Sequence, residues 1–452
     1  MWSKLESFIL EKMSKTRLPG LSIAIVSGNE IIYANGFGFR DIEYGLPATP
    51  RTIYGIGSVT KSFTALSIMQ LVEKGVLSLE DPIEKFIPLE IRPFGEEIRI
   101  WHLLTHSSGI PALAYAEAFI SSIVGDYATW VPIASHKDVL PFMSDAEDWV
   151  ISKPGKEFYY LNEGYVILGH IIEKVSGIRY EDYVKRNILK PLKMERSFFS
   201  REELEKDIDK ATPYVIDREG KWIKSTYPFG ITSDGGLLSN TLDLANYIVM
   251  YLNRGRFNSV ELVSSKTLEE MEKPRIIYKY SYFPSEGYAL GWSVIPNFLG
   301  YKLIHHSGSV LVSTAYVGYL PEKKLGVVIL ANASGYPLSF IGMYALALAL
   351  GRDPDKDVEP LRHDRLLDEL CGIYETYKST MRIYVERRGG VLYLVMKGKY
   401  RVSEIPLIPE RLGEDEALFF TSRLGLKVPV KFRKRDNYVE LVYDRYLLRR
   451  KV

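Results

Sequence analysis

The sequence predicts an α+β domain followed by a small antiparallel β-barrel. Helical patterns and β-hairpin patterns are mixed over the first three quarters of the chain, which is long enough for two domains. A charged segment bounded by prolines, at 353–360, then marks a change in composition. Beyond it, short strand-like runs with close turns are typical of an up-and-down barrel. We therefore expect domains at 1–352 and 363–452, joined by a linker at 353–362.

The first elements in chain order are a helix and a hairpin. Residues 1–16 have an amphipathic helical pattern, and the apolar runs 21–26 and 31–34 flank a Gly28-Asn29 turn. A glycine-marked turn then leads to Ser58 and to a helix that ends near Gly75.

Later segments alternate between the two types. We expect a short helix in the stretch from residue 98 that is stopped by Gly109 and Pro111, further helices at 165–172, 241–253 and 340–350, and strands at 300–309, 313–320 and 326–331. The apolar insertion 112–153 fits a cover over a cleft and ordinary helical core equally well. In the second domain we expect strands at 380–387, 391–397, 400–408, 417–421, 427–434, 437–443 and 445–450.

Composition excludes several classes of function. The net charge is +2 with no long basic block, so nucleic acid is not an expected partner. Cys371 is the only cysteine, which rules out an internal disulfide. No apolar run reaches the ~18–20 residues that cross a membrane, and the N-terminal pattern lacks the features of a signal peptide. We expect a cytoplasmic protein without membrane contact.

A shortage of glutamine also stands out. Gln70 is the only one, against 58 Lys+Arg and 56 Asp+Glu. Scarce glutamine and abundant charge are typical of thermophilic proteins. The hypothesis would fail if thermal unfolding gave a midpoint in the ordinary mesophilic range.

The stretch Ser58-Val59-Thr60-Lys61 is the first candidate for chemistry. Residues three apart share one face of a helical turn, so the Lys61 amine can approach the Ser58 hydroxyl. A lysine can take the proton of a serine only when burial or a nearby cation lowers its pKa. Alone, the pattern fits equally an N-cap serine followed by a surface lysine.

Two further motifs follow in order, Tyr160-Leu161-Asn162 and His306-Ser307-Gly308. Tyr160 alone could be aromatic packing, and His306 alone could be a strand histidine bonded to the backbone. His305 should point to the other face of its strand, so we assign it no role. His102 and His106 have the spacing of metal ligands on a helix, but no third ligand follows. We predict no metal and no cofactor.

With the three motifs together, the sequence resembles the serine β-lactamase and penicillin-binding-protein superfamily, in its class C-like branch. The resemblance covers about residues 15–350 and includes the phrase at 103–109. It implies an antiparallel sheet flanked by helices, an all-helical subdomain and, for residues 363–452, a lipocalin-like barrel. The two-part layout is similar to archaeal exopeptidases that act on D-amino-acid-containing peptides and form homo-oligomers.

The resemblance also implies residue roles. Ser58 would attack a carbonyl and become acylated, and Lys61 would act as its general base or as a stabilising cation. Tyr160 would pass a proton to the leaving group; to act as an anion it needs a pKa well below ~10, which two nearby cations could cause. Asn162 would hold Lys61 and the substrate amide. The backbone N–H groups of Ser58 and Ser309 would form an oxyanion hole, next to the substrate-binding Ser307 and Gly308.

One motif departs from the pattern of the superfamily. β-Lactamases and DD-peptidases usually carry lysine where this chain has His306, and that lysine supplies a cation for the substrate carboxylate. A histidine is mostly neutral at pH 7. The departure favours the aminopeptidase and esterase branches over β-lactamases and DD-carboxypeptidases, and our leading hypothesis is a peptidase or aminopeptidase on small peptides or amides. A carboxylesterase, a β-lactamase or DD-carboxypeptidase, and a non-catalytic penicillin-binding sensor stay as alternatives. The barrel could bind a ligand, close a neighbouring subunit's site or drive assembly.

Overall fold

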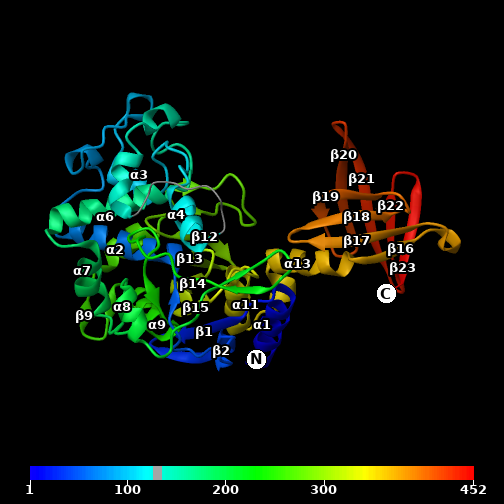
Figure 1. Cartoon of the computed structure of the whole chain (residues 1–452), viewed down its shortest axis with the longest axis horizontal. Helices are drawn as coiled ribbons and strands as arrows, with labels where there is room; N and C mark the ends of the chain where they lie inside the picture. The colour runs from blue at the N-terminus through cyan, green and yellow to red at the C-terminus, as the bar shows by residue number, and fades with distance from the viewer. Residues whose placement is uncertain (126–134, 452) are drawn as a thin grey trace. The chain divides into compact units, whose positions relative to one another are not determined.

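In the computed structural model, which describes residues 1–125 and 135–451, the chain divides into two units. Met1–Leu350 forms the first unit and Gly351–Val452 the second. Figure 1 shows the chain coloured from its N-terminus to its C-terminus. The first unit mixes helices with a large sheet and the second is a closed barrel. The expected α+β fold followed by an antiparallel barrel is confirmed.

A nine-stranded antiparallel sheet, in the order β10-β11-β12-β13-β14-β15-β1-β2-β3, is the centre of the first unit. Its middle strands are buried along nearly their whole length, as expected for strands covered on both faces. The strands are β1 (Gly20–Ser27), β2 (Glu30–Asp41), β3 (Leu46–Pro47), β10 (Ile276–Ile277), β11 (Gly287–Tyr288), β12 (Ser293–Phe298), β13 (Tyr301–Ser309), β14 (Thr314–Leu320) and β15 (Leu325–Ala331).

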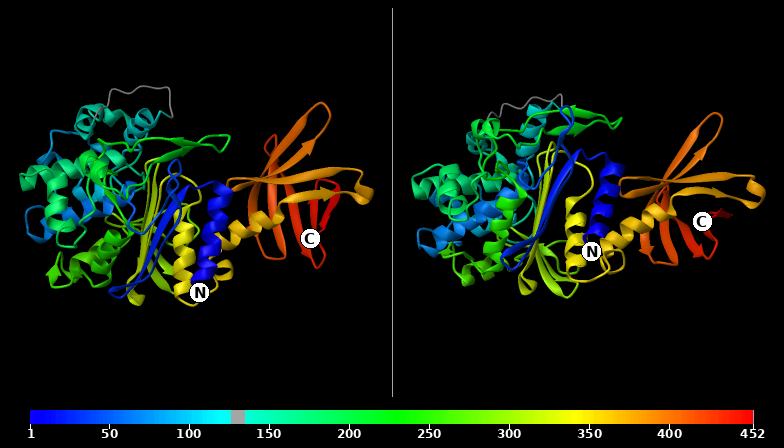
Figure 2. Two further views of the ribbon diagram at one scale, coloured as in Figure 1. Left: turned by 60° about the horizontal axis from the view of Figure 1, so that its bottom comes forward. Right: turned by 90° about the horizontal axis from the view of Figure 1, so that it is seen from below.

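Helices cover both faces of this sheet (Figure 2). On one face, α1 (Trp2–Thr16) packs against α11 (Leu338–Ala349), with the rings of Phe8 and Tyr344 stacked 3.9 Å apart. On the other face, α9 (Thr241–Leu252) packs against β1 and β15. The turn η1 (Gly57–Val59), which carries Ser58, packs against β13 and β14.

A helical subdomain packs against α2 (Thr60–Glu73), which is buried along nearly its whole length. Its largest helix, α6 (Asn162–Ser176), contacts α2, α3, α4 and α7. The remaining helices of the unit are α3 (Ile100–Leu104), α4 (Tyr115–Val124), α5 (Val139–Phe142), α7 (Tyr180–Val184), α8 (Arg201–Lys206) and α10 (Ser265–Met271). Short strand pairs are β4 (Tyr54–Gly55) with β7 (Leu238–Ser239), β5 (Tyr214–Ile216) with β6 (Trp222–Lys224), and β8 (Arg256–Phe257) with β9 (Val260–Glu261).

In the part that the structure describes, the insertion 112–153 contributes both to the core and to the wall of a cavity, which Glu117 and Ile120 of α4 line. Tyr115 and Phe119 of α4 are buried in the main hydrophobic cluster. Residues 126–134, which belong to the same prediction, lie outside the described residues.

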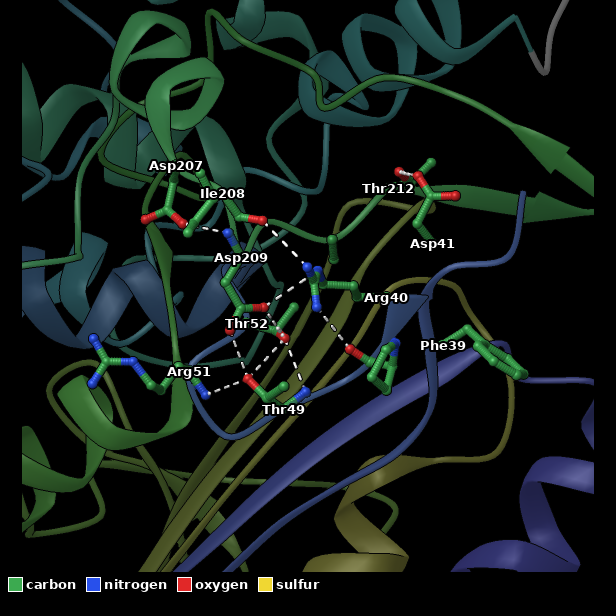
Figure 3. Close-up of polar contacts among 12 residues, drawn as sticks. Phe39, Arg40, Asp41, Thr49, Arg51, Thr52, Asp207, Ile208, Asp209 and Thr212 are labelled. Carbon is green, nitrogen blue, oxygen red and sulfur yellow. Dashed lines mark hydrogen bonds and ion pairs between the residues drawn. The ribbon is translucent and has the colours of Figure 1, made fainter. Parts of the chain in front are cut away.

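A polar network holds the chain segment that leads to Ser58 (Figure 3). The Asp209 carboxylate accepts hydrogen bonds from the hydroxyls of Thr49 and Thr52, at 2.7 and 2.6 Å. It also lies 3.4 Å from the guanidinium of Arg40 on β2, which donates a hydrogen bond to the backbone carbonyl of Pro47. Because charge-assisted hydrogen bonds are strong, the network fixes the segment before β4 against the sheet edge.

Eight strands close into an antiparallel barrel in the second unit. They are β16 (Gly372–Glu375), β17 (Arg382–Arg388), β18 (Val391–Lys397), β19 (Val402–Leu412), β20 (Glu416–Arg423), β21 (Leu426–Arg435), β22 (Tyr438–Tyr443) and β23 (Tyr446–Lys451). The sequence did not predict β16. The segment 353–362 is helical, since it contains α12 (Pro354–Asp357) and the start of α13 (Glu359–Leu370). Leu366 and Leu370 of α13 pack into the barrel core.

None of the helices in residues 1–125 and 135–451 combines the length and the apolar character that crossing a bilayer requires.

Candidate active site

Ser58 stands out by its exposure. Residues 52–57 and 59–71 are all buried, and Ser58 between them is partly exposed. It lies in η1, directly before α2, after Gly57 with a φ of 51°. An L-residue at Gly57 would be strained by this φ, and its Cβ would lie 2.6 Å from the backbone nitrogen of Ser309. The turn therefore exposes the serine hydroxyl to solvent, while the residues on either side of Ser58 are buried and hold the turn in place.

Lys61 is fully buried, and its amine contacts three acceptors. Its Nζ donates to Ser58 Oγ at 3.1 Å, to Asn162 Oδ1 at 2.7 Å and to the backbone carbonyl of Asp234 at 2.7 Å. Burial lowers the pKa of Lys61 from 10.5 to about 8, against the opposing effect of the carboxylates of Asp234 and Glu117. When the amine is neutral, the bonds to Asn162 and Asp234 use both N–H groups and leave the lone pair for the Ser58 proton.

Tyr160 also lies beside the nucleophile, where its side chain interacts with that of Ser58. Its ring stacks on His106 with centroids 4.0 Å apart, and Lys61 Nζ lies 4.9 Å from its centroid. Burial raises the pKa of Tyr160 above its ordinary value. This direction is opposite to the one that a phenolate at Tyr160 would require, so the surroundings favour the neutral phenol.

His306 is neutral, and each of its two ring nitrogens has a hydrogen-bond partner. Burial lowers its pKa to about 3. Its Nδ1 lies 2.6 Å from the Ser307 carbonyl oxygen, which can only accept, so Nδ1 carries the proton. Nε2, at 2.8 Å from the Tyr288 hydroxyl, then accepts from that tyrosine. His306 supplies neither a cation nor a free base in this arrangement.

The end of β13 touches the nucleophile turn. A Cβ at Gly308 would lie 1.9 Å from the Ile56 carbonyl oxygen and 3.0 Å from the Ser58 nitrogen. Only glycine allows this approach, which brings the backbone of Ser309 next to that of Ser58. Two N–H groups so placed could stabilise an oxyanion on a carbonyl that Ser58 attacks.

A cavity of about 730 Å³ joins these residues. The predicted site residues on its wall are Ser58, Tyr160, Asn162, His306, Ser307, Gly308 and Ser309. The structure thus brings together the three motifs of the sequence, with Lys61 directly behind Ser58. His305 contributes to the wall as well, and its Nε2 lies 3.5 Å from Glu286 Oε1.

Sequence reasoning missed several groups of the site. Tyr288 orients His306, and His106 accepts a hydrogen bond from the Leu161 N–H at 2.9 Å, which fixes the Tyr160 segment. Glu163 is buried next to Asn162, and burial raises its pKa to about 7. Asp234 lies in the glycine-rich stretch 231–239, to which the sequence assigned no role. No local pattern marks these residues, because they reach the site through tertiary contacts.

The structure also bears on metal binding. Within the described part of the chain, no three His, Cys, Asp or Glu side chains form a group that could hold an ion. His102 and His106 each use Nδ1 to accept a backbone N–H, from Arg99 and Leu161.

Comparison with known families decides the classification. A model of the beta-lactamase family matches residues 5–351, almost the whole first unit. The chain belongs to the beta-lactamase family. A second model, described as the Pab87 octamerisation domain, matches residues 354–449.

Individual members of the beta-lactamase family agree with this. The octameric penicillin-binding protein homologue from Pyrococcus abyssi is 50% identical, with a TM-score of 0.94 over 99% of both chains. Penicillin binding protein from Bacillus halodurans is 25% identical, with a TM-score of 0.61 over 76% of this chain and 98% of that one. Protein Flp of Staphylococcus aureus is 28% identical over 337 residues, which cover 73% of this chain. The match spans 62% of Flp, so this chain corresponds to less than two thirds of that relative.

Proposed function

We propose that the protein is a serine hydrolase that works through an acyl-enzyme on Ser58. The observation that carries the proposal is the buried Lys61 amine, held 3.1 Å from Ser58 Oγ with its pKa lowered to about 8. An amine with this pKa is partly neutral near pH 7–8, where a general base is most effective. Ser58, Lys61, Tyr160 and His306 form the catalytic group, with Asn162, Ser307, Gly308 and Ser309 at the substrate.

Ser58, Lys61 and Tyr160 each have a defined step in this mechanism, and neutral His306 lines the cavity beside them. Neutral Lys61 takes the Ser58 proton as Oγ bonds to the substrate carbonyl carbon, and the N–H groups of Ser58 and Ser309 stabilise the oxyanion. The Tyr160 hydroxyl donates its proton to the leaving amine as the C–N bond breaks, and it is reprotonated from Lys61. Water then attacks the ester carbonyl, and the same groups return the proton to Ser58 Oγ.

The proposed substrates are small peptides or amides, with D-residues among them. The neutral state of His306 supports this choice over a β-lactamase or DD-carboxypeptidase, because the site lacks a lysine at that position for a substrate carboxylate. A panel of matched L- and D-aminoacyl amides and esters tests it. Turnover of esters alone would favour a carboxylesterase, and a permanent β-lactam adduct without turnover would favour a sensor.

We further propose that the second unit drives assembly into a homo-oligomer. The match of 354–449 to the Pab87 octamerisation domain and the octameric Pyrococcus abyssi homologue support an octamer. Large apolar side chains, including Tyr400, Leu424 and Leu426, are exposed on the barrel, as on surfaces that bind other chains. The proposed boundaries are a catalytic domain at 1–352 and an assembly domain at 363–452, with 353–362 between them.

Removal of residues 353–452 tests both the boundary and the role of the barrel. Light scattering should show loss of the oligomer, while the remaining part should keep the labelling of Ser58 by a fluorophosphonate. An oligomer that survives the deletion would overturn the assembly role.

A further inference from the structure

The wall of the active-site cavity carries an unusual charge. Among the described residues that line it, Glu117 and Asp234 are carboxylates, and neither a lysine nor an arginine occurs. Lys61 lies behind Ser58, and the neutral His306 adds no positive charge. The described part of the cavity wall therefore offers acidic side chains and no lysine or arginine to a substrate, which favours a cationic group over an anionic one.

Among the residues that the structure describes, one carboxylate oxygen of Asp234 is buried without a hydrogen-bond donor. The residue is 2% exposed and lines the cavity, yet its Oδ1 has no hydrogen-bond partner in the described residues. Burial raises the pKa of the Asp234 carboxyl above its ordinary value, against the opposing effects of Lys61 and of the backbone N–H groups of Asp234 and Thr232, and Oδ1 stays without a donor in that part of the chain. A buried carboxylate oxygen without a donor is costly, so the geometry points to a donor that is supplied by a ligand.

Lys61 is not that donor. All three hydrogen bonds of its amine go to Ser58, Asn162 and the backbone carbonyl of Asp234, and none goes to the Asp234 carboxylate. The charge of Asp234 is close enough to act on Lys61 through space. Its Oδ1 is still available for a second cation.

Glu117 lines the same cavity as Asp234 and Ser58. Asn162, which holds Lys61 through Oδ1, donates from Nδ2 to Glu117 Oε1 at 3.3 Å. Three successive hydrogen bonds thus link Ser58 to the Glu117 carboxylate, through Lys61 and Asn162. Glu117 is exposed on the cavity wall, so an incoming substrate can reach it.

We propose that Asp234 and Glu117 form an ammonium subsite for the free amino group of the substrate. In an aminoacyl compound the amino group is two bonds from the carbonyl carbon, so its subsite must lie beside Ser58, where both carboxylates are. A primary ammonium has three donors and would satisfy Oδ1 of Asp234 by a charge-assisted hydrogen bond. The inference rests on the proposed serine hydrolase function and names its substrate class, peptides or amides with an unblocked N-terminus.

The kinetic test compares a substrate with its blocked counterpart. Alanine p-nitroanilide of each chirality is assayed beside its N-acetyl derivative, with p-nitrophenyl acetate as a neutral substrate. Acetylation should lower kcat/KM by about 10- to 100-fold, the usual effect of losing a hydrogen bond to a charged group. The acetylation ratio is kcat/KM of the free amine divided by kcat/KM of its N-acetyl derivative. Asp234→Asn and Glu117→Gln should each shift this ratio towards one. The ratio cancels any common effect of Asp234→Asn on Lys61.

A matched control and a direct binding measurement complete the test. Glu80→Gln removes an exposed carboxylate that pairs with Arg99 away from the cavity, and it should leave the ratio unchanged. Calorimetry with alaninamide and N-acetylalaninamide on Ser58→Ala needs no catalysis. Alaninamide should bind at least about 10-fold more tightly, and Asp234→Asn or Glu117→Gln in that background should remove the difference.

The outcomes separate the two proposals. Equal binding of both amides, or an acetylation ratio that neither substitution changes, would overturn the ammonium subsite. Absence of any turnover or labelling of Ser58, with preferential binding of alaninamide intact, would instead contradict the hydrolase function and leave the subsite supported. Should Asp234→Asn fail to fold, the exposed Glu117→Gln still gives both readouts.

Discussion

The Lys61 amine lies 3.1 Å from the Ser58 hydroxyl and is completely shielded from solvent. In the proposed mechanism this pair carries out the first proton transfer. Burial lowers the pKa of the amine, and the bonds to Asn162 and Asp234 hold it in place. The other groups of the cavity act on the position or the proton of this pair.

Replacement of Lys61 tests its role as base. Lys61→Met should lower the rate of Ser58 acylation by about 10²–10⁴-fold, the usual contribution of a positioned acid or base. Stopped-flow kinetics with a chromogenic ester measures it. Lys74→Met, an exposed position at the end of α2, is the matched control and should react at the wild-type rate. A Lys61→Met enzyme as fast as wild type would remove Lys61 from the mechanism.

Replacement of Tyr160 distinguishes proton donation from packing. Since Tyr160 is neutral, Tyr160→Phe should mainly impair protonation of the leaving group. We expect a loss of about 10²–10⁴-fold on an alkyl amide, but under 10-fold on a p-nitrophenyl ester, whose leaving group needs no proton. Equal losses on both substrates would indicate that the ring only positions its neighbours, such as His106.

Because Glu163 is buried, we expect the free energy of unfolding of the protein to depend on pH. Burial raises its pKa in the folded state from 4.5 to about 7, so the folded protein holds a proton there that the unfolded chain releases. The favourable effect is complete below pH 4.5 and is lost as the pH rises through about 7. Denaturant unfolding of wild type and Glu163→Gln should therefore show the variant gaining relative stability across this window, by about 3 kcal/mol at most. If the difference in the free energy of unfolding between wild type and Glu163→Gln did not change with pH, the raised pKa of Glu163 would be contradicted.

The contact between β13 and the nucleophile turn can be tested at Gly308. A Cβ there would lie 1.9 Å from the Ile56 carbonyl oxygen, so Gly308→Ala must push the strand and the turn apart. We expect activity to fall by about 10²–10³-fold, as when one oxyanion donor is lost, together with a lower melting midpoint. Gly390→Ala, where an added Cβ meets nothing within 4 Å, should change neither. Full activity of Gly308→Ala would exclude the proposed oxyanion hole.

Local sequence patterns predicted much of this arrangement. The spacing of Ser58 and Lys61 is enough to place both on one turn, and the family resemblance implies that Asn162 holds the amine, to which its Oδ1 is hydrogen-bonded. Strands β13 to β15 were predicted from apolar runs, two of which are separated by a turn that begins at Pro321. The barrel was predicted from its seven longer strands, whereas the four-residue β16 was too short to show a pattern.

Other features depend on contacts that only the fold creates. Asp234 reaches Lys61 across 173 positions of sequence, and Tyr288 is one tyrosine among 31. For Tyr160 the sequence suggested nearby cations, and the Lys61 amine does lie over its ring, but burial is the larger influence: it raises the pKa of Tyr160 and lowers that of His306. The sequence alone does not show which individual side chains are completely buried, and the pKa values of Tyr160 and His306 depend on this burial.

The most direct measurement is the rate at which a fluorophosphonate modifies Ser58 as a function of pH, followed by intact mass and peptide mapping. The account predicts a single adduct on Ser58, with a rate that rises as Lys61 deprotonates around pH 8, and a slow reaction in Lys61→Met. A rate that does not change between pH 6 and 10, or an adduct on another residue, would contradict it.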